Sequence, residues 1–325
     1  MIKTEFFKSK IRAADVGAFG GIPEYWKPFL DQMLIEAFEP DKEECKKQSK
    51  LKSKNINWHP IGLAEETKLI PLYVLNRETG SSLFPPNEEI LNRFNHYSYS
   101  GINKIIDIPC HSLSDLISKE KINSFHLIKI DSQGSELRIL NGLKAEDRLD
   151  LCAIELEVSF IPLYKDIPLF GDIDKYLQEI GFEIWDLRTH RAYQMDNENG
   201  KRYIDKILNF KSGNNLISPQ LVQGDALYFK RIELIEKSHF PYILIISCIY
   251  KAFDKFQSIL EHGKSNLWIN ETEYQEWIQF AKQNFDKPKF SHKLKFLVDK
   301  LINKIFKFDP NDKRIFWTNR VFPDQ

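Results

Sequence analysis

The stretch that most constrains the fold is residues 12–21, with the sequence RAADVGAFGG. Its mostly apolar first part ends at Asp15, and Gly17 and Gly21 follow within the next six residues. Glycine can adopt backbone angles, and allow close approaches, that a side chain forbids. The stretch therefore predicts a buried strand that ends on a carboxylate and turns through glycines into a helix, because apolar residues then recur at helical spacing over residues 25–34.

A second acidic residue follows at a spacing typical of a ribose-binding acid. Residues 35–40, IEAFEP, predict a short strand ending in Glu39, 22 residues after Gly17, and an acid about 20 residues beyond the glycine turn accepts both ribose hydroxyls in nucleotide-binding folds. Phe19 stands where a dinucleotide fingerprint has its second glycine, so its ring would obstruct a pyrophosphate. Asp15 would likewise repel phosphate, but it would attract an ammonium group.

These features favour S-adenosylmethionine (SAM), which has a ribose and an ammonium group but no phosphate, over a nicotinamide dinucleotide. The alternative is a tight turn needed only for packing. The residues expected to bind the cofactor are Asp15, Gly17, Ala18, Phe19, Gly21, Glu39 and Pro40.

Composition narrows the class of protein. The chain has 325 residues, and Lys+Arg and Asp+Glu both number 46, so no global field favours nucleic acid or an anionic membrane as partner. The four cysteines have no metal-like spacing. The N-terminus lacks the apolar core of a signal peptide, and the longest apolar run, residues 242–250, is too short for a transmembrane segment. We therefore expect a cytoplasmic protein that binds no nucleic acid.

The rest of the chain alternates strand and helix, which predicts a mostly parallel α/β sheet with helices on both faces. The last two strands, separated by a polar insertion over residues 188–218, are expected to pair antiparallel. The strands predicted after the first two span residues 56–64, 71–76, 105–110, 125–131, 151–158, 182–187 and 221–230.

Carboxylates mark the candidate catalytic positions. Asp131 ends the strand 125–131, at the edge where open α/β sheets bind ligands, and it is either a general base or a partner of Lys129. Glu136, in the first turn of the next helix, is the second catalytic candidate, although the helix dipole also explains it. Glu155 and a bound divalent metal are competitors, but no cluster of His, Asp or Glu has convincing ligand spacing.

Two further features stay open at this point. His190, beside two arginines, is either a base or a surface histidine in a basic patch. Residues 78–86, rich in Gly, Ser and Pro, form either a loop that closes over a substrate or a surface connection.

Six motifs occur in the order and spacing of the FkbM family of SAM-dependent methyltransferases, which this chain resembles over residues 12–231. The most specific is KIDSQGSE, which begins at Lys129. The chain departs from the family pattern at Phe19, where Asn is usual, and at Ser132, where Val is usual. The other motifs are DVGAFGG at residues 15–21, AFEP at 37–40, PCHSLSDLI at 109–117, IE at 154–155 and GDALYF at 224–229.

The resemblance implies a Rossmann-like class I methyltransferase fold with seven strands, within a domain that we place at residues 1–232. It also implies methylation of a hydroxyl oxygen on a sugar, polyketide or other cell-surface or secondary-metabolite precursor. Residues 233–325 are expected to form an α-helical extension with helices over 240–262, 271–285 and 290–306. The extension is either a packed subdomain or a docking surface for a carrier, a glycosyltransferase or a lipid-linked substrate.

The sequence thus predicts a SAM-dependent O-methyltransferase acting on a hydroxyl of a sugar, a glycan or a related secondary-metabolite precursor. Asp131 is the expected base, and the acceptor is a small molecule or a glycan. Two alternatives stay open, a non-catalytic module that binds a glycan or protein in the same crevice and an NAD-dependent oxidoreductase.

Overall fold

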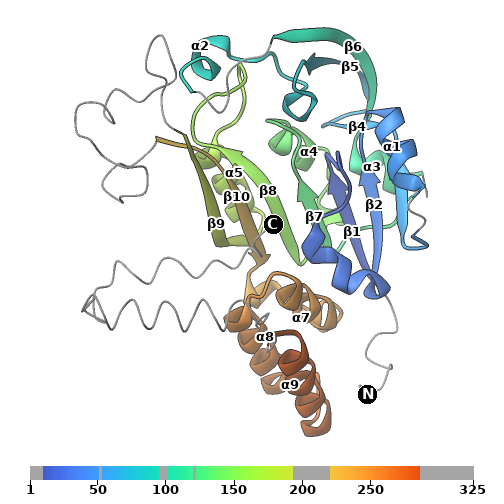
Figure 1. The fold of residues 1–325 in the computed structure, drawn as a ribbon. Helices are drawn as coiled ribbons and strands as arrows, with labels where there is room; N and C mark the ends of the chain where they lie inside the picture. Colours follow the sequence, from blue (N-terminus) through green and yellow to red (C-terminus); the bar gives the residue numbers. More distant parts are fainter. Residues whose placement is uncertain (1–9, 51–52, 95–100, 120–121, 193–219, 286–325) are drawn as a thin grey trace, which may run out of the picture. The chain divides into compact units, whose positions relative to one another are not determined.

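The computed structural model describes residues 10–50, 53–94, 101–119, 122–192 and 220–285 (Figure 1). The described residues fall into two compact units, one within Ser9–Ile235 and the other within Glu236–Gln325. No helix of the described ranges is long and apolar enough to cross a membrane.

A seven-stranded sheet organises the first unit, in the strand order β3-β2-β1-β7-β8-β10-β9. All neighbours pair in parallel up to β8, and β10 runs antiparallel to both β8 and β9. The predicted mostly parallel sheet with an antiparallel final pair is therefore confirmed. The strands are β1 (Ile11–Val16), β2 (Met33–Phe38), β3 (Ile56–His59), β7 (Leu127–Ile130), β8 (Ala153–Ser159), β9 (Phe182–Ala192) and β10 (Gln220–Lys230).

Helices pack apolar side chains against this sheet around one large core. Its members include Leu116 of α3, Ile139 of α4 and Leu177 of α5, together with Ile128 and Ile130 of β7. Ser112 caps α3 by accepting a hydrogen bond from the backbone nitrogen of Asp115. The helices are α1 (Lys42–Ser49), α2 (Glu88–Leu91), α3 (Leu113–Ser118), α4 (Glu136–Asn141) and α5 (Phe170–Glu179), with short 3₁₀ segments η3 (Glu78–Gly80), η4 (Glu146–Arg148) and η5 (Ile232–Leu234).

The connection between β1 and β2 differs from the predicted helix over residues 25–34. It is a 3₁₀ segment, η2 (Glu24–Gln32), and β2 already begins at Met33. Pro28 lies inside the segment and has no N–H to donate, which disfavours a regular α-helix there. Met33 and Ile35 are buried and Leu34 is exposed, so this part of the apolar run follows the two-residue period of a strand.

A second sheet, which the sequence analysis does not predict, is inserted between β3 and α3. It has the order β4-β6-β5, with β4 (Gly62–Leu63) parallel and β5 (Lys68–Leu75) antiparallel to β6 (Ile102–His111). The third strand that the sequence predicts within residues 56–64 is β3, but the turn expected after it leads at Gly62 into β4, which belongs to the second sheet. Figure 1 shows β5 and β6 near the ends of the strands that carry the candidate site.

The insertion predicted to start at residue 188 begins later. β9 continues to Ala192, because residues 188–192 pair with β10, through Arg188 with Asp225 and His190 with Gln223. The remainder of the predicted insertion lies outside the described residues.

The second unit consists of α7 (Phe240–Ile249), α8 (Phe253–Ser265) and α9 (Glu271–Phe285). The prediction of a single helix over residues 240–262 is wrong, because the helix is interrupted at Lys251, whose φ is 54°. Within this unit Phe240, Phe256 and Trp277 meet edge to face and form its aromatic centre. The helix predicted over residues 290–306 lies outside the described residues.

Candidate active site

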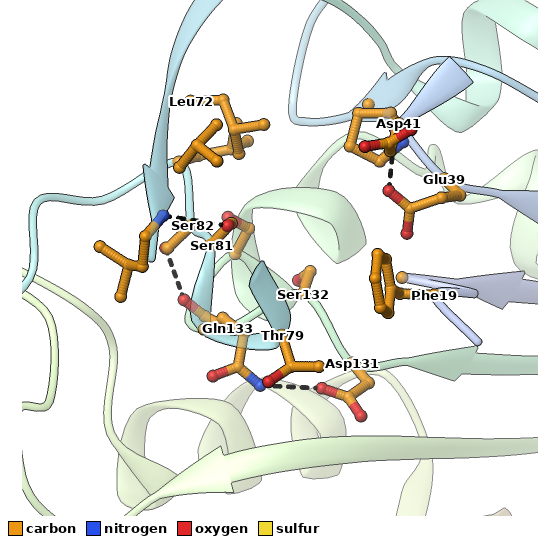
Figure 2. Close-up of a pocket in the computed structure, with 18 of the residues that line it drawn as sticks. Phe19, Glu39, Asp41, Leu72, Thr79, Ser81, Ser82, Asp131, Ser132 and Gln133 are labelled. Atoms are coloured by element: carbon orange, nitrogen blue, oxygen red, sulfur yellow. Dashed lines mark hydrogen bonds between the residues drawn. The ribbon is translucent and has the colours of Figure 1, made fainter. Parts of the chain in front are cut away.

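A cavity of about 520 Å³ lies where the carboxyl ends of the central strands meet the inserted sheet. β1, β2, β7 and β8 contribute one side, which carries the carboxylates of Glu39, Asp41, Asp131 and Glu157, here called the acidic wall. The other side comes from β5, β6 and the segment between them, and includes Leu72. Figure 2 shows Leu72 across the cavity from Glu39 and Asp41.

Gly17 brings the ends of β1 and β7 together. Its φ is 79°, and a Cβ built on it would lie 1.9 Å from the backbone oxygen of Asp131. The backbone nitrogen of Asp131 in turn donates to the oxygen of Val16 at 2.9 Å. Any side chain at position 17 would therefore push away the residue that we expect to be the base.

Behind this turn the buried Asp15 lies beside the partly buried Lys129. The Lys129 Nζ lies 3.7 Å from Asp15 Oδ1 and 3.9 Å from Asp131 Oδ2, so the lysine stands between two carboxylates. Burial raises the pKa of Asp15 to about 6, against the opposing effect of Lys129. Both carboxylate oxygens of Asp15 are buried and accept no hydrogen bond from the described residues. Asp15 thus has unused capacity for a ligand that brings hydrogen-bond donors.

Glu39 follows β2 and lines the cavity. Its Oε1 accepts a hydrogen bond from the backbone nitrogen of Asp41 at 2.9 Å. Burial raises its pKa to about 7. The carboxylate is held from behind and points into the cavity, with the ring of Phe19 between it and Asp131 (Figure 2).

The other expected cofactor residues divide into two groups. Phe19, 39% exposed, and Pro40 line the cavity with Gly17 and Glu39. Ala18 is buried, and Gly21 has a φ of 110° and faces the side chain of Gln48, so these two shape the turn without lining the cavity.

Glu136 does not line the cavity and is buried beneath it. Its Oε1 accepts hydrogen bonds from the backbone nitrogens of Ser132 and Gly134 and from the Ser132 hydroxyl, at 3.0 to 3.2 Å. Burial raises the pKa of this carboxyl to about 7. In this structure Glu136 holds the turn that follows Asp131.

Gln133, which the sequence analysis does not single out, connects the two sides of the cavity. Its Nε2 donates to Asp131 Oδ1 at 3.1 Å and to Glu157 Oε2 at 2.8 Å. Its Oε1 accepts from the Tyr164 hydroxyl at 3.0 Å, and its backbone oxygen accepts from the Ser82 hydroxyl at 2.6 Å. The φ of 56° places Gln133 in the left-handed region, a strain that functional sites often retain.

Glu157 of β8 also lines the cavity and is not among the residues expected from the sequence. Burial, reinforced by neighbouring carboxylates that include Asp131, raises its pKa well above the usual range. The sequence indicates that Glu157 needs a partner, because it is an acidic residue on an apolar strand. It does not identify that partner, Gln133, which follows a different strand, β7. Glu155 is also buried but does not line the cavity, and its carboxylate accepts hydrogen bonds from the hydroxyl of Tyr25.

His190 also lines the cavity. Its Nε2 lies 2.9 Å from Asp225 Oδ2, and the Arg188 Nε donates to the same oxygen at 2.8 Å. Burial opposes ionisation of Asp225, but His190 and Arg188 outweigh it and lower the pKa of the carboxyl. Among the described residues, no group of three or more His, Cys, Asp or Glu side chains is arranged to hold a metal ion.

The strand order and the site at the carboxyl ends define a class I methyltransferase fold. The model of the methyltransferase FkbM domain matches residues 15–184, which is more than half of the chain. The chain therefore belongs to the FkbM family of methyltransferases, as the resemblance implies, and its family and fold support SAM-dependent methyl transfer. No curated protein matches the sequence.

Solved structures of methyltransferases are similar to this chain at low identity. The methyltransferase FkbM from Methylobacillus flagellatus is 16% identical, with a TM-score of 0.36, over 68% of this chain and 43% of that one. This chain thus spans less than half the length of that protein. A putative methyltransferase from Bacillus halodurans is 12% identical, with a TM-score of 0.33, over 69% of this chain and 92% of that one.

Proposed function

We propose that the protein transfers a methyl group from SAM to a hydroxyl oxygen of a sugar, a glycan or a related secondary-metabolite precursor. The observation that carries the proposal is the position of Asp131. Its carboxylate lines the cavity, its side chain is 40% exposed, and its backbone lies against the Gly17 turn. A base at this point can reach both a cofactor held by the turn and an acceptor in the cavity.

The acidic side of the cavity suits SAM. Asp15 does not itself line the cavity and lies buried behind the Gly17 turn, where its two carboxylate oxygens accept no hydrogen bond from the described residues, which fits the ammonium group. Glu39 lines the cavity with a carboxylate that fits the two ribose hydroxyls. Gly17, Ala18, Phe19, Gly21 and Pro40 complete the expected binding residues. When bound, SAM supplies a sulfonium methyl that is already a good electrophile.

The protein must then orient the acceptor hydroxyl and remove its proton. Positioning supplies about 7–11 kcal/mol in favourable cases, and a general base contributes about 10²–10⁴-fold. Asp131 Oδ2 is the proton acceptor in this proposal, while Gln133 holds Oδ1. Thr79, Ser81, Asn103 and Gln223 also line the cavity and can bond a polyhydroxylated acceptor.

Asp131→Asn tests the proposal, because it keeps the shape of the side chain and removes its basicity. We expect turnover to fall by about 10²–10⁴-fold with SAM affinity nearly unchanged. If Asp131 serves only as a partner of Lys129, the variant instead loses stability and keeps its rate. Lys129 retains Asp15 at 3.7 Å, so we expect the fold to tolerate the change.

Three quantities are measured on the same protein preparation. They are the rate of methyl transfer from SAM to a crude fraction that contains the acceptor, the SAM affinity and the melting temperature. Asp107→Asn is the matched control, since Asp107 is exposed on β6 and does not line the cavity. A well-folded and fully active Asp131→Asn protein would exclude Asp131 as the base and as a needed counter-ion.

A further inference from the structure

The inserted sheet presents an apolar face to the cavity. Leu72 pairs with Ile106 across β5 and β6, and Val74 pairs with Lys104 one step further along. All four residues line the cavity, together with Arg77 at the end of β5. We call these five residues the inserted wall.

The face is partly covered and partly open. One step deeper, Ile70 and Ile108 pair and belong to a small buried core. Towards the cavity the described residues leave the face open, and Ile106 is 39% exposed although Leu72 and Ile108 beside it on the same face are apolar. An aliphatic surface left open inside a cavity is typical of a ligand-binding site.

Charge divides the cavity in the same way. The acidic wall carries the carboxylates of Glu39, Asp41, Asp131 and Glu157, whereas the inserted wall carries the cations Lys104 and Arg77, both exposed. A cationic cofactor is attracted to the acidic wall. A group that binds against the inserted wall gains most if it is negatively charged, because the carboxylates opposite repel it towards the lysine.

We propose that the acceptor is an amphiphilic anion, with an aliphatic portion that packs on Leu72 and Ile106 and a phosphate or carboxylate group that pairs with Lys104. This inference rests on the proposed function, because it assigns the acidic wall to SAM. It narrows the acceptor from any hydroxylated molecule to one that carries both an aliphatic part and a negative charge. The wall residues are aliphatic, whereas a bare sugar ring is better matched by aromatic faces.

Binding to the full-length protein saturated with S-adenosylhomocysteine (SAH) tests the inference without requiring turnover. The three probes are hexyl phosphate, 1-hexanol and inorganic phosphate, titrated in parallel at constant ionic strength. We expect hexyl phosphate to bind about tenfold or more tightly than either of the others, since only it satisfies both parts of the wall.

Two pairs of variants locate the binding. Lys104→Gln should weaken hexyl phosphate about fivefold, whereas Lys119→Gln, which changes an exposed lysine outside the cavity, should not. Ile106→Asn should weaken it by a similar factor. Its control is Leu69→Asn, because Leu69 is 68% exposed on the same sheet and does not line the cavity.

Three results would overturn the inference. They are equal binding of hexyl phosphate and inorganic phosphate, equal binding of hexyl phosphate and 1-hexanol, and equal losses in the test and control variants. SAH affinity is measured separately for every protein. Hexyl phosphate binding that depends on Lys104 and Ile106 in a protein that does not bind SAH would support a site for amphiphilic anions on the inserted wall and count against the proposed function.

Discussion

The two walls of the cavity differ in origin and in chemistry. The acidic wall is built from the carboxyl ends of parallel strands, where Gly17 fixes how closely β1 and β7 approach. The inserted wall is a face of a separate antiparallel pair, aliphatic with cations. The first wall comes from the strand ends of the main sheet, where we propose that the cofactor binds, and the second comes from the inserted sheet, where we propose that the acceptor binds.

The largest effect is expected from breaking the acidic wall at its turn. In Gly17→Ala the new Cβ would meet the Asp131 oxygen at 1.9 Å, in a backbone conformation that alanine disfavours. Left-handed strain and overpacking together should cost about 2–5 kcal/mol of unfolding free energy. Denaturant unfolding measures this loss.

Gly20→Ala is the control for that experiment. Its φ is 84°, close to that of Gly17, but nothing lies within 4 Å of the added Cβ. Only the strain, about 1–2 kcal/mol, should remain. Equal losses in the two variants would show that the contact with Asp131 does not constrain position 17.

A smaller effect, confined to cofactor binding, is expected from Glu39. Glu39→Ala removes a charged acceptor for two hydroxyls, and hydrogen bonds to charged groups contribute about 1.5–3 kcal/mol, so SAM affinity should fall roughly 10-fold to 150-fold. Calorimetry provides the measurement, and Ile106→Asn, on the inserted wall, should leave SAM affinity unchanged. Unchanged SAM affinity in Glu39→Ala would show that the ribose does not bind to Glu39.

The smallest effect is the pH dependence of the two carboxylates expected to bind SAM, Asp15 behind the turn and Glu39 in the acidic wall. Burial raises the pKa of Asp15 to about 6 and of Glu39 to about 7. The raised pKa values stabilise the folded protein fully below the pKa values that the two groups have in the unfolded chain, near 4. This stabilisation is lost as the pH rises through 6 and 7. SAM needs the ionised forms, so its affinity should fall by about tenfold from pH 8 to pH 6, with proton release on binding below pH 7.

Calorimetry in two buffers of different ionisation enthalpy measures the released protons. The pH dependence should be much weaker in Glu39→Gln, which cannot ionise at that position. A pH-independent affinity in the unaltered protein would show that neither carboxylate contacts the cofactor.

Local patterns predict two carboxylates of the acidic wall, Glu39 and Asp131, because each follows a strand whose signal lies within one short segment. The strand ending near Asp15, the strand before Glu39 and the strand before Asp131 each carry their own signal, and a parallel sheet brings such ends together. The inserted wall could not be predicted, since the strand runs 71–76 and 105–110 give no sign of which sheet they join. Gln133 and Glu157 were missed because their bond depends on tertiary placement.

The most direct test of the central claim is calorimetry of the full-length protein with SAM, SAH and NADH. The acidic wall, Phe19 and the buried Asp15 predict that SAM and SAH bind and that NADH does not, because a pyrophosphate would meet the ring of Phe19 and repelling carboxylates. NADH binding more tightly than SAM would contradict the account.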